Sequence, residues 1–228
     1  MFRWFRPAIV LMAGAIVSSA SAANLRDGFS YLSDIDPTIV QDMRYAGPDN
    51  FTHAPVPGYG AGECVLTTEA AKALADVQAD LRAKGYGLLV YDCYRPAKAV
   101  RRFVEWAAEA RPIDPEHNPH VARGHLLAEG YIGRRSSHSS GGTIDLTLVR
   151  LGEKTSMPMG TGFDFFDPLA YTASRQVSAE ARANRKLLVV AMARRGFRNY
   201  KREWWHFRYE REPFAGKMFD FDITPKRR

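Results

Sequence analysis

The chain has 228 residues, of which 46% are hydrophobic and 25% charged, proportions close to those of ordinary globular proteins. They exclude a collagen-like, low-complexity or disordered chain, and two cysteines are too few for a disulfide scaffold or a four-cysteine zinc site. The net charge of +7 comes from 32 basic and 25 acidic residues, scattered without a basic stripe or a nucleic-acid motif, so no nucleic-acid partner is expected.

The N-terminus has the three parts of a secretory signal peptide. A positively charged beginning is followed by an apolar run over residues 8–17 and then by small residues, and cleavage is expected after Ala22 or Ala23. Spanning a bilayer takes about 20 apolar residues, so an uncleaved membrane anchor is the lesser alternative. We therefore expect a signal peptide over 1–22, a single domain over 23–228, and an exported, periplasmic protein without a stable membrane anchor.

The first half of the mature chain predicts two helices separated by a short strand. Residues 24–66 are rich in turn-forming proline and glycine. Apolar residues spaced by three and four then predict a helix over 67–84, which Gly85 ends. A strand is predicted over 88–91, and Pro96 opens a second helix.

The second half begins with a long irregular stretch over 111–135, and ordered loops of this length are usually functional. Strict alternation over 143–149 predicts a strand with Asp145 on its polar face. A helix over 178–195 and a final strand over 204–209 follow. Because helices and strands mix without regular alternation, the predicted class is α+β, with a small, mostly antiparallel sheet and packed helices.

Cys64 and Cys93 are the two cysteines of the chain. In an oxidising compartment such a pair is more often a disulfide than a metal or catalytic pair, and two separate buried thiols are the alternative. Cys64 precedes a predicted helix and Cys93 follows the next predicted strand, so a return of the chain can bring them together. We predict that they form a disulfide.

His138 is the histidine with the most informative surroundings. A glycine pair, Gly141 and Gly142, follows it and permits a tight turn or a close backbone approach. Asp145 comes seven residues after His138, on the polar face of the predicted strand. A turn followed by a strand can bring the two side chains to one point, as a catalytic diad or as two ligands of one metal. Four other histidines have no acidic partner at an evident spacing and remain unassigned: His53, His117, His120 and His125.

A second acidic and imidazole pair is Glu203 and His206, separated by two tryptophans. At the start of a strand the backbone can turn and bring the pair together, and the tryptophans would exclude water. A surface glutamate beside a core histidine is the alternative, which this motif alone favours. With His138 and Asp145 added, however, the set matches a catalytic zinc site, which has three protein ligands and one position for water. A carboxylate that is not a ligand then serves as general base and acid.

Arg95 lies where the predicted strand of 88–91 gives way to the helix that Pro96 opens. A guanidinium fixed at such a corner can stabilise the oxyanion that exists only in a transition state. A salt bridge to Asp92 is the alternative reading.

The three motifs together resemble the zinc D-alanyl-D-alanine dipeptidases, which are related to zinc D,D-carboxypeptidases and have a Hedgehog-like fold. The motifs are Asp92-Cys93-Tyr94-Arg95-Pro96, Ser136-x-His138 with Asp145, and Glu203-Trp204-Trp205-His206. The resemblance extends over most of the mature chain, from Asp42-Met43-Arg44-Tyr45 to Phe207.

The resemblance implies a role for each motif residue. One zinc ion per chain would be held by His138, Asp145 and His206. Catalysis would depend on Glu203 as base and acid and on Arg95 as transition-state stabiliser. The substrate would be bound through its carboxylate end by Ser136 and through its amino end by Tyr45 and Asp164. Two departures from the family pattern, neither of which removes a ligand, are Ser140 in place of a basic residue and Thr143 in place of a small alanine.

The function implied is hydrolysis of the D-alanyl-D-alanine dipeptide. One alternative is a D,D-carboxypeptidase acting on longer cell-wall peptides, which would need an open groove. The segment 111–135 would cover one end of the site and so favours the short substrate. The other alternative is a non-catalytic, zinc-dependent wall-binding module, which would need neither Glu203 nor Arg95.

Overall fold

The computed structural model describes residues 25–109 and 113–226, so the predicted signal peptide lies outside the described residues. A five-stranded sheet with the order β2-β4-β5-β7-β6 occupies the centre. In that order its strands are Val40–Gln41, Tyr86–Asp92, Thr143–Arg150, His206–Tyr209 and Phe197–Asn199. β2 pairs with β4 in parallel, whereas the other three pairings are antiparallel. The predicted α+β class with a mostly antiparallel sheet is confirmed.

A second, two-stranded antiparallel sheet pairs β1 (Phe29–Tyr31) with β3 (Val65–Thr67). The helices are α1 (Leu32–Ile35), α2 (Thr68–Arg82), α3 (Ala97–Ala108) and α4 (Ala179–Arg194). Single turns of 3₁₀ helix are η1 (Arg44–Ala46), η2 (Arg123–His125), η3 (Ser137–Ser140) and η4 (Pro168–Ala170). No helix within 25–109 or 113–226 combines the length and apolar character needed to cross a bilayer.

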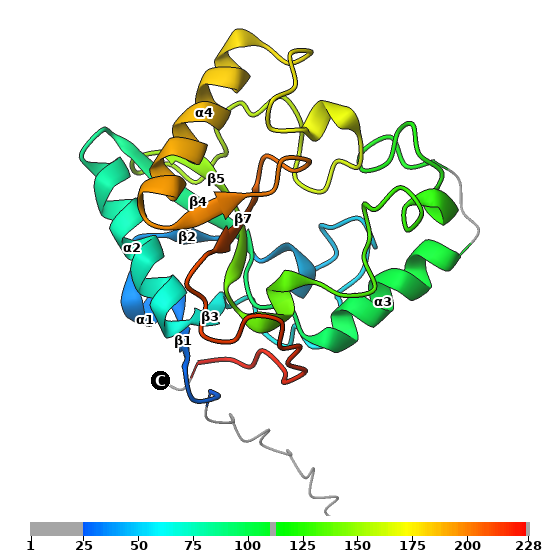
Figure 1. Ribbon diagram of the computed structural model, residues 1–228, viewed down its shortest axis with the longest axis horizontal. Helices are drawn as coiled ribbons and strands as arrows, with labels where there is room; N and C mark the ends of the chain where they lie inside the picture. Colours follow the sequence, from blue (N-terminus) through cyan, green and yellow to red (C-terminus); the bar gives the residue numbers. More distant parts are fainter. Residues whose placement is uncertain (1–24, 110–112, 227–228) are drawn as a thin grey trace, which may run out of the picture.

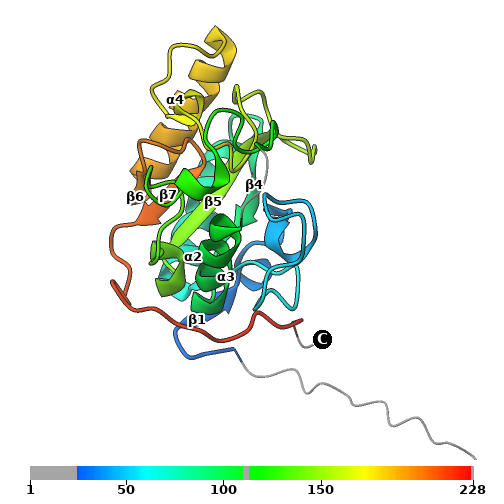
Figure 2. The same cartoon turned by 90° about the vertical axis from the view of Figure 1, so that its right-hand side faces the viewer.

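The central sheet separates two layers of helices. α2 and α4 pack on one face, and α3 lies on the other (Figures 1 and 2). The apolar side chains of β5 alternate as the sequence predicts, and Ile144, Leu146 and Leu148 are fully buried in the core that they share with Leu74 and Val77 of α2. The opposite face of β5 carries Thr143, Asp145 and Thr147, so the polar side of this strand faces the layer of α3 and the loops around it.

The predicted helices and the middle strands are present, with boundaries shifted by at most two residues. The final strand is shorter than predicted, because Trp204 and Trp205 belong to a turn in which the His206 amide donates to the Glu203 carbonyl at 3.3 Å. The sequence did not reveal β1, β2, β3, α1 or β6. These elements have two to four residues each, too few to show a periodic pattern.

The C-terminal tail buttresses the segment that leads into β5. It runs along the bottom of the molecule beside β1 (Figure 2). The Phe219 amide donates to the Ser139 carbonyl of η3, and the Phe219 carbonyl accepts from Ala97 at the start of α3, both at 2.9 Å. The ring of Phe29 from β1 contacts the rings of Tyr94 and Phe219 edge-on. The C-terminal tail therefore connects η3 to β1 and to the start of α3.

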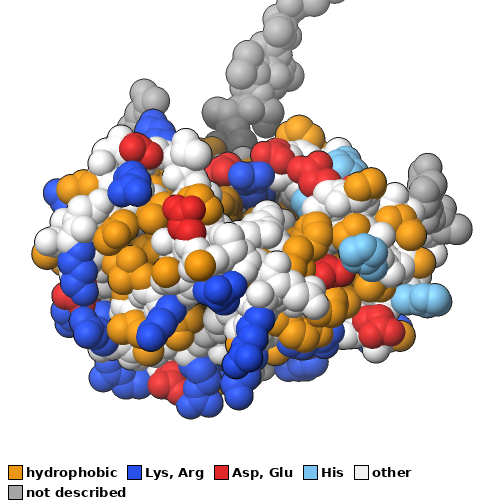
Figure 3. Space-filling model, turned by 90° about the horizontal axis from the view of Figure 1, so that it is seen from above, with side chains coloured by type: hydrophobic (Ala, Val, Ile, Leu, Met, Phe, Trp, Pro, Cys, Tyr) orange, Lys and Arg blue, Asp and Glu red, His pale blue; other side chains and the backbone are white. Residues whose placement is uncertain are grey.

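On the face shown in Figure 3, Lys and Arg side chains lie mostly over the left and lower parts, with hydrophobic and uncharged side chains between them. Several arginines are also paired with acids, such as Arg195 with Asp80 at 2.7 Å.

Cys64 and Cys93 form the predicted disulfide, with their Cα atoms 5.4 Å apart and both residues fully buried. The bond connects the segment just before β3 to the residue that follows β4. Asp92 and Arg95, on either side of Cys93, both reach the polar face of the sheet, so the disulfide anchors the backbone that carries them.

Replacing both cysteines by serine is expected to lower the free energy of unfolding by about 3–4 kcal/mol, the loop-entropy value for a closed loop of this size. Urea unfolding of the oxidised wild type and of the Cys64→Ser/Cys93→Ser variant measures the difference. The reduced wild type is the matched control and should unfold near the midpoint of the variant. Equal midpoints for the oxidised and reduced wild type would contradict the expected contribution.

Candidate active site

Three polar residues lie in one row across three neighbouring strands. Asp92 of β4 is opposite Asp145 of β5, and Asp145 is opposite His206 of β7. The β4–β5 register shifts between Val90 and Asp92, and such an irregularity turns a side chain to the other face of a sheet. Asp92 thereby shares the polar face with Asp145. The facing carboxylates of Asp92 and Asp145 repel each other, so positively charged groups nearby would stabilise this arrangement.

His138 reaches this row from η3, and its own amide donates to the hydroxyl of the N-cap residue Ser136 at 3.3 Å. The turn ends at Gly141, with φ at 84°, where a Cβ atom would lie 2.3 Å from the ring of Phe29. A Cβ on Gly142 would likewise lie 2.1 Å from the carboxylate of Glu212. The glycine pair therefore permits both the tight turn and the close backbone approach that the sequence predicts.

The orientation of the His138 ring follows from its neighbours. Its Nδ1 atom lies 2.7 Å from the Cys93 carbonyl oxygen, which can only accept a hydrogen bond. Nδ1 therefore donates to this carbonyl, and Nε2 is the ring nitrogen that faces the interior of the site. Metal-binding histidines have this arrangement, in which a backbone carbonyl or carboxylate orients the ring.

His138, Asp145 and His206 form the candidate metal site. His138 Nε2 lies 3.3 Å from His206 Nδ1 and 3.3 Å from Asp145 Oδ2. Ligands about 2.0–2.1 Å from a tetrahedral zinc ion are themselves roughly 3.3–3.4 Å apart, so these spacings suit zinc. Asp145 Oδ1 is buried and accepts no hydrogen bond from the described residues, although His206 Nδ1 lies 3.0 Å away. A bound cation would satisfy this oxygen, and the donor set therefore fits a metal ion.

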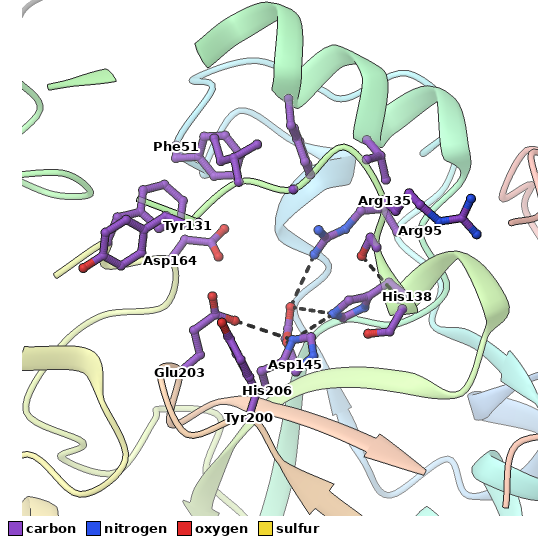
Figure 4. Close-up of a pocket in the computed structure, with 18 of the residues that line it drawn as sticks. Phe51, Arg95, Tyr131, Arg135, His138, Asp145, Asp164, Tyr200, Glu203 and His206 are labelled. Atoms are coloured by element: carbon purple, nitrogen blue, oxygen red, sulfur yellow. Dashed lines mark hydrogen bonds and ion pairs between the residues drawn. The ribbon is translucent and has the colours of Figure 1, made fainter. Parts of the chain in front are cut away.

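Glu203 lies beside this set without belonging to it. Its Oε2 atom is 3.6 Å from His206 Nδ1, and its carboxylate points into the pocket toward Asp164 (Figure 4). In the metal-free protein, burial raises the pKa of Glu203 to about 7, with His206 opposing and the charge of Asp145 adding to the rise. A carboxyl group with such a pKa can accept and return a proton near neutral pH.

Arg95 forms the salt bridge to Asp92 that the sequence offered as one reading, and it also lines the site. Its Nε atom donates to Asp92 at 2.9 Å, and one terminal nitrogen lies 3.5 Å from Asp145 Oδ2 (Figure 4). The Asp92 carboxylate also accepts from the Tyr59 hydroxyl at 2.7 Å. The guanidinium is thus fixed by a buried salt bridge and still faces the site, beside the ring of Tyr45. It supplies the positive charge that the row of carboxylates needs.

Asp164 and Tyr45 form the opposite end of the pocket. The Tyr45 hydroxyl donates to Asp164 Oδ2 at 2.5 Å, and both residues are buried. Asp164 has a φ of 54°, a left-handed conformation that aspartate tolerates better than most residues. Burial and the charge of Asp145 raise the pKa of Asp164 well above its usual value. A cationic group bound here would stabilise the carboxylate, as expected of a site for a substrate ammonium.

These side chains line one cavity of about 290 Å³. Ser136 and Ser137 lie in its wall together with the candidate metal ligands, Glu203 and Arg95. Trp204 and Trp205 are buried but do not line it, contrary to the expectation that they wall the site. The aromatic lining comes instead from six residues in separate segments, of which the sequence predicted Tyr45 alone: Tyr45, Phe51, Phe103, Tyr131, Phe166 and Tyr200.

Three of the unassigned histidines have partners that no short spacing could reveal. His53 Nε2 lies 3.0 Å from Asp114, and His120 Nδ1 lies 2.7 Å from Asp167. The ring of His117 is buried, with Nδ1 3.3 Å from the Asp164 carbonyl oxygen. These residues lie outside the lining of the cavity.

Of the two departures from the family pattern, one has a structural explanation. The Ser140 hydroxyl donates to the Ser137 carbonyl at 2.6 Å and to the buried carboxylate of Glu212 at 2.9 Å, which closes η3. The Thr143 hydroxyl is buried without a hydrogen-bond partner among the described residues, and nothing in the structure explains its presence.

Comparisons of the sequence with known proteins point to one family. The model of the Peptidase_M15 family, described as D-ala-D-ala dipeptidase, matches residues 26–224. A D-alanyl-D-alanine dipeptidase of Enterococcus faecium is 39% identical and one of Streptomyces coelicolor is 38% identical, each match covering 86% of this chain and 98% of the relative. A dipeptidase of the same name from Escherichia coli is 32% identical over 85% of this chain and 92% of its own. Among solved structures, the Zn(II) complex of the vancomycin resistance D,D-pentapeptidase VanY aligns at 18% identity and a TM-score of 0.38, over 68% of this chain and 77% of that one.

Proposed function

Because the chain belongs to the Peptidase_M15 family of D-ala-D-ala dipeptidases, we propose that it is a zinc peptidase that hydrolyses the D-alanyl-D-alanine dipeptide. The observation that carries the proposal is the convergence of three ligand atoms, from His138, Asp145 and His206, within 4.8 Å of one another beside the carboxylate of Glu203. A metal site with an adjacent carboxylate that is not a ligand is the arrangement that peptide hydrolysis requires.

Each residue around the ligands has a part in the proposed reaction. Zinc held by the three ligands would supply Lewis acidity toward water and the peptide carbonyl. Glu203 takes a proton from the attacking water and returns it to the leaving nitrogen as the C–N bond breaks. Arg95, already fixed by Asp92, stabilises the negative charge that develops on the carbonyl oxygen.

The two ends of the cavity support a short substrate with free ends. Asp164, held by Tyr45, offers a buried carboxylate to an ammonium group, and the Ser136 hydroxyl serves the carboxylate end. A cavity of about 290 Å³ is at the small end of the range for ligand pockets. These features favour the dipeptide over a longer wall peptide. Glu203 and Arg95 favour an enzyme over a binding module, which would need neither.

The proposal is tested with purified protein and a panel of D,D-, L,D- and L,L-dipeptides plus a wall pentapeptide, assayed with and without a chelator. D-Ala-D-Ala should be hydrolysed fastest, and activity should disappear with chelator and return with added zinc. The L,L-dipeptide is the stereochemical control. Preferred cleavage of the pentapeptide would identify a carboxypeptidase, and zinc-dependent binding without turnover would identify a wall-binding module.

A further inference from the structure

A loop forms the wall of the cavity at the end where Asp164 would bind the substrate's amino group. Gly130, Tyr131 and Ile132 line the cavity, and the loop that carries them closes on the fully buried Leu126. The amides of Tyr131 and Ile132 both donate to the Leu126 carbonyl, at 2.9 and 3.1 Å. This wall belongs to the stretch that the sequence predicts to cover one end of the site.

Arg202 connects this wall to the segment that carries Tyr171. Its guanidinium lies 4.7 Å from the ring centre of Tyr131 and 5.6 Å from that of Tyr171. It also donates to the Tyr171 hydroxyl at 3.2 Å and to the Glu129 carbonyl at 2.8 Å. Gly130 permits this approach, because a Cβ at that position would lie 3.1 Å from the guanidinium. One planar side chain therefore holds the loop from two sides.

The position of Tyr131 in the pocket links its contact with Arg202 to the length of the substrate. Figure 4 shows Tyr131 beside Asp164, across the pocket from the candidate metal ligands. In the proposed function, Asp164 binds the substrate's amino group. Any residue attached to that amino group would have to leave the pocket past Tyr131. The loop therefore stands where a longer peptide would extend.

We propose that Arg202 is a specificity-determining residue, which holds the Tyr131 ring in place at the end of the pocket and so limits the substrate to two residues. The inference rests on the proposed function. Arg202 touches no reacting atom and acts through Tyr131, so it is a positioning residue. Arg202 directly precedes Glu203 in the chain. The same turn therefore positions the carboxylate of Glu203 and, through Arg202, the loop that carries Tyr131.

The test compares kcat/KM for D-Ala-D-Ala with that for a tripeptide extended at the amino end, L-Lys-D-Ala-D-Ala. Arg202→Ala should raise the tripeptide-to-dipeptide ratio by roughly tenfold or more, the scale of discrimination that pocket contacts provide. Arg202→Lys keeps the charge but not the planar stacking, so its ratio should lie between those of the wild type and Arg202→Ala. Lys201→Ala, at the neighbouring exposed position, should leave the ratio unchanged.

Tyr131→Ala removes the ring that forms the wall but leaves Arg202 in place. This variant should also raise the tripeptide-to-dipeptide ratio of kcat/KM. It therefore tests the inference even if Arg202→Ala does not fold. Circular dichroism and zinc content identify the folded variants. An unchanged ratio in the folded variants would overturn the inference. A wild type that hydrolyses neither peptide would instead overturn the proposed function, so the two failures are distinguishable.

Discussion

Glu203→Gln is expected to lower kcat for D-Ala-D-Ala by at least about 10³-fold, while KM changes much less. The amide keeps the size of the side chain and much of its hydrogen bonding but cannot accept the proton of water. A positioned proton-transfer group contributes about 10²–10⁴-fold, and here one residue serves first as base and then as acid. Because the carboxylate lies outside the ligand set, zinc content should stay at the level of the wild type.

Steady-state kinetics and metal analysis of the same preparation check both parts of this expectation. Glu105→Gln, at an exposed position of α3, is the matched control and should keep full activity. A Glu203→Gln variant that retains zinc and near-normal turnover would show that the proposed proton transfer is wrong. A variant that loses zinc would show that Glu203 is itself a ligand.

The candidate ligands were predictable because each lies in a local pattern with a clear geometric consequence. Alternation over 143–149 places Asp145 on a polar face, and the glycine pair before it permits the turn that carries His138. Glu203 and His206 share a side for a similar local reason, since the chain turns between them. The long helices were predictable from apolar spacing. These features depend on interactions within about ten residues.

What the sequence did not show depends on contacts between distant segments. Asp92 meets Asp145 only because β4 is irregular at its end, and no pattern in the sequence predicts that register shift. The aromatic lining of the pocket is assembled from separate segments, among them α3 and η1, and the expectation that the adjacent tryptophans wall the site is wrong. Arg202 contacts rings 71 and 31 residues away in the sequence, and nothing in the local sequence distinguishes it from the other arginines.

His206→Ala is expected to lose zinc and activity together. Structural zinc sites with four ligands bind with about 10–16 kcal/mol, so one ligand accounts for roughly 2.5–4 kcal/mol and its loss weakens binding about 10²–10³-fold. His138→Ala and Asp145→Ala should behave in the same way. Competition with a chromophoric chelator measures the affinity, and metal analysis after dialysis measures the content. His125→Ala, which changes an exposed histidine outside the pocket, should keep both zinc and turnover.

The comparison of His206→Ala with Glu203→Gln separates ligand from base, which the structure places only 3.6 Å apart. If His206 is a ligand, its loss removes the metal, and added zinc in excess should restore part of the activity because Glu203 is still present. If Glu203 is the base, added zinc should restore nothing to Glu203→Gln, since its metal was never lost. Undiminished zinc in all three ligand variants would refute the assigned site. Rescue of Glu203→Gln by added zinc would instead show that Glu203 is a metal ligand and that the roles of Glu203 and His206 must be reassigned.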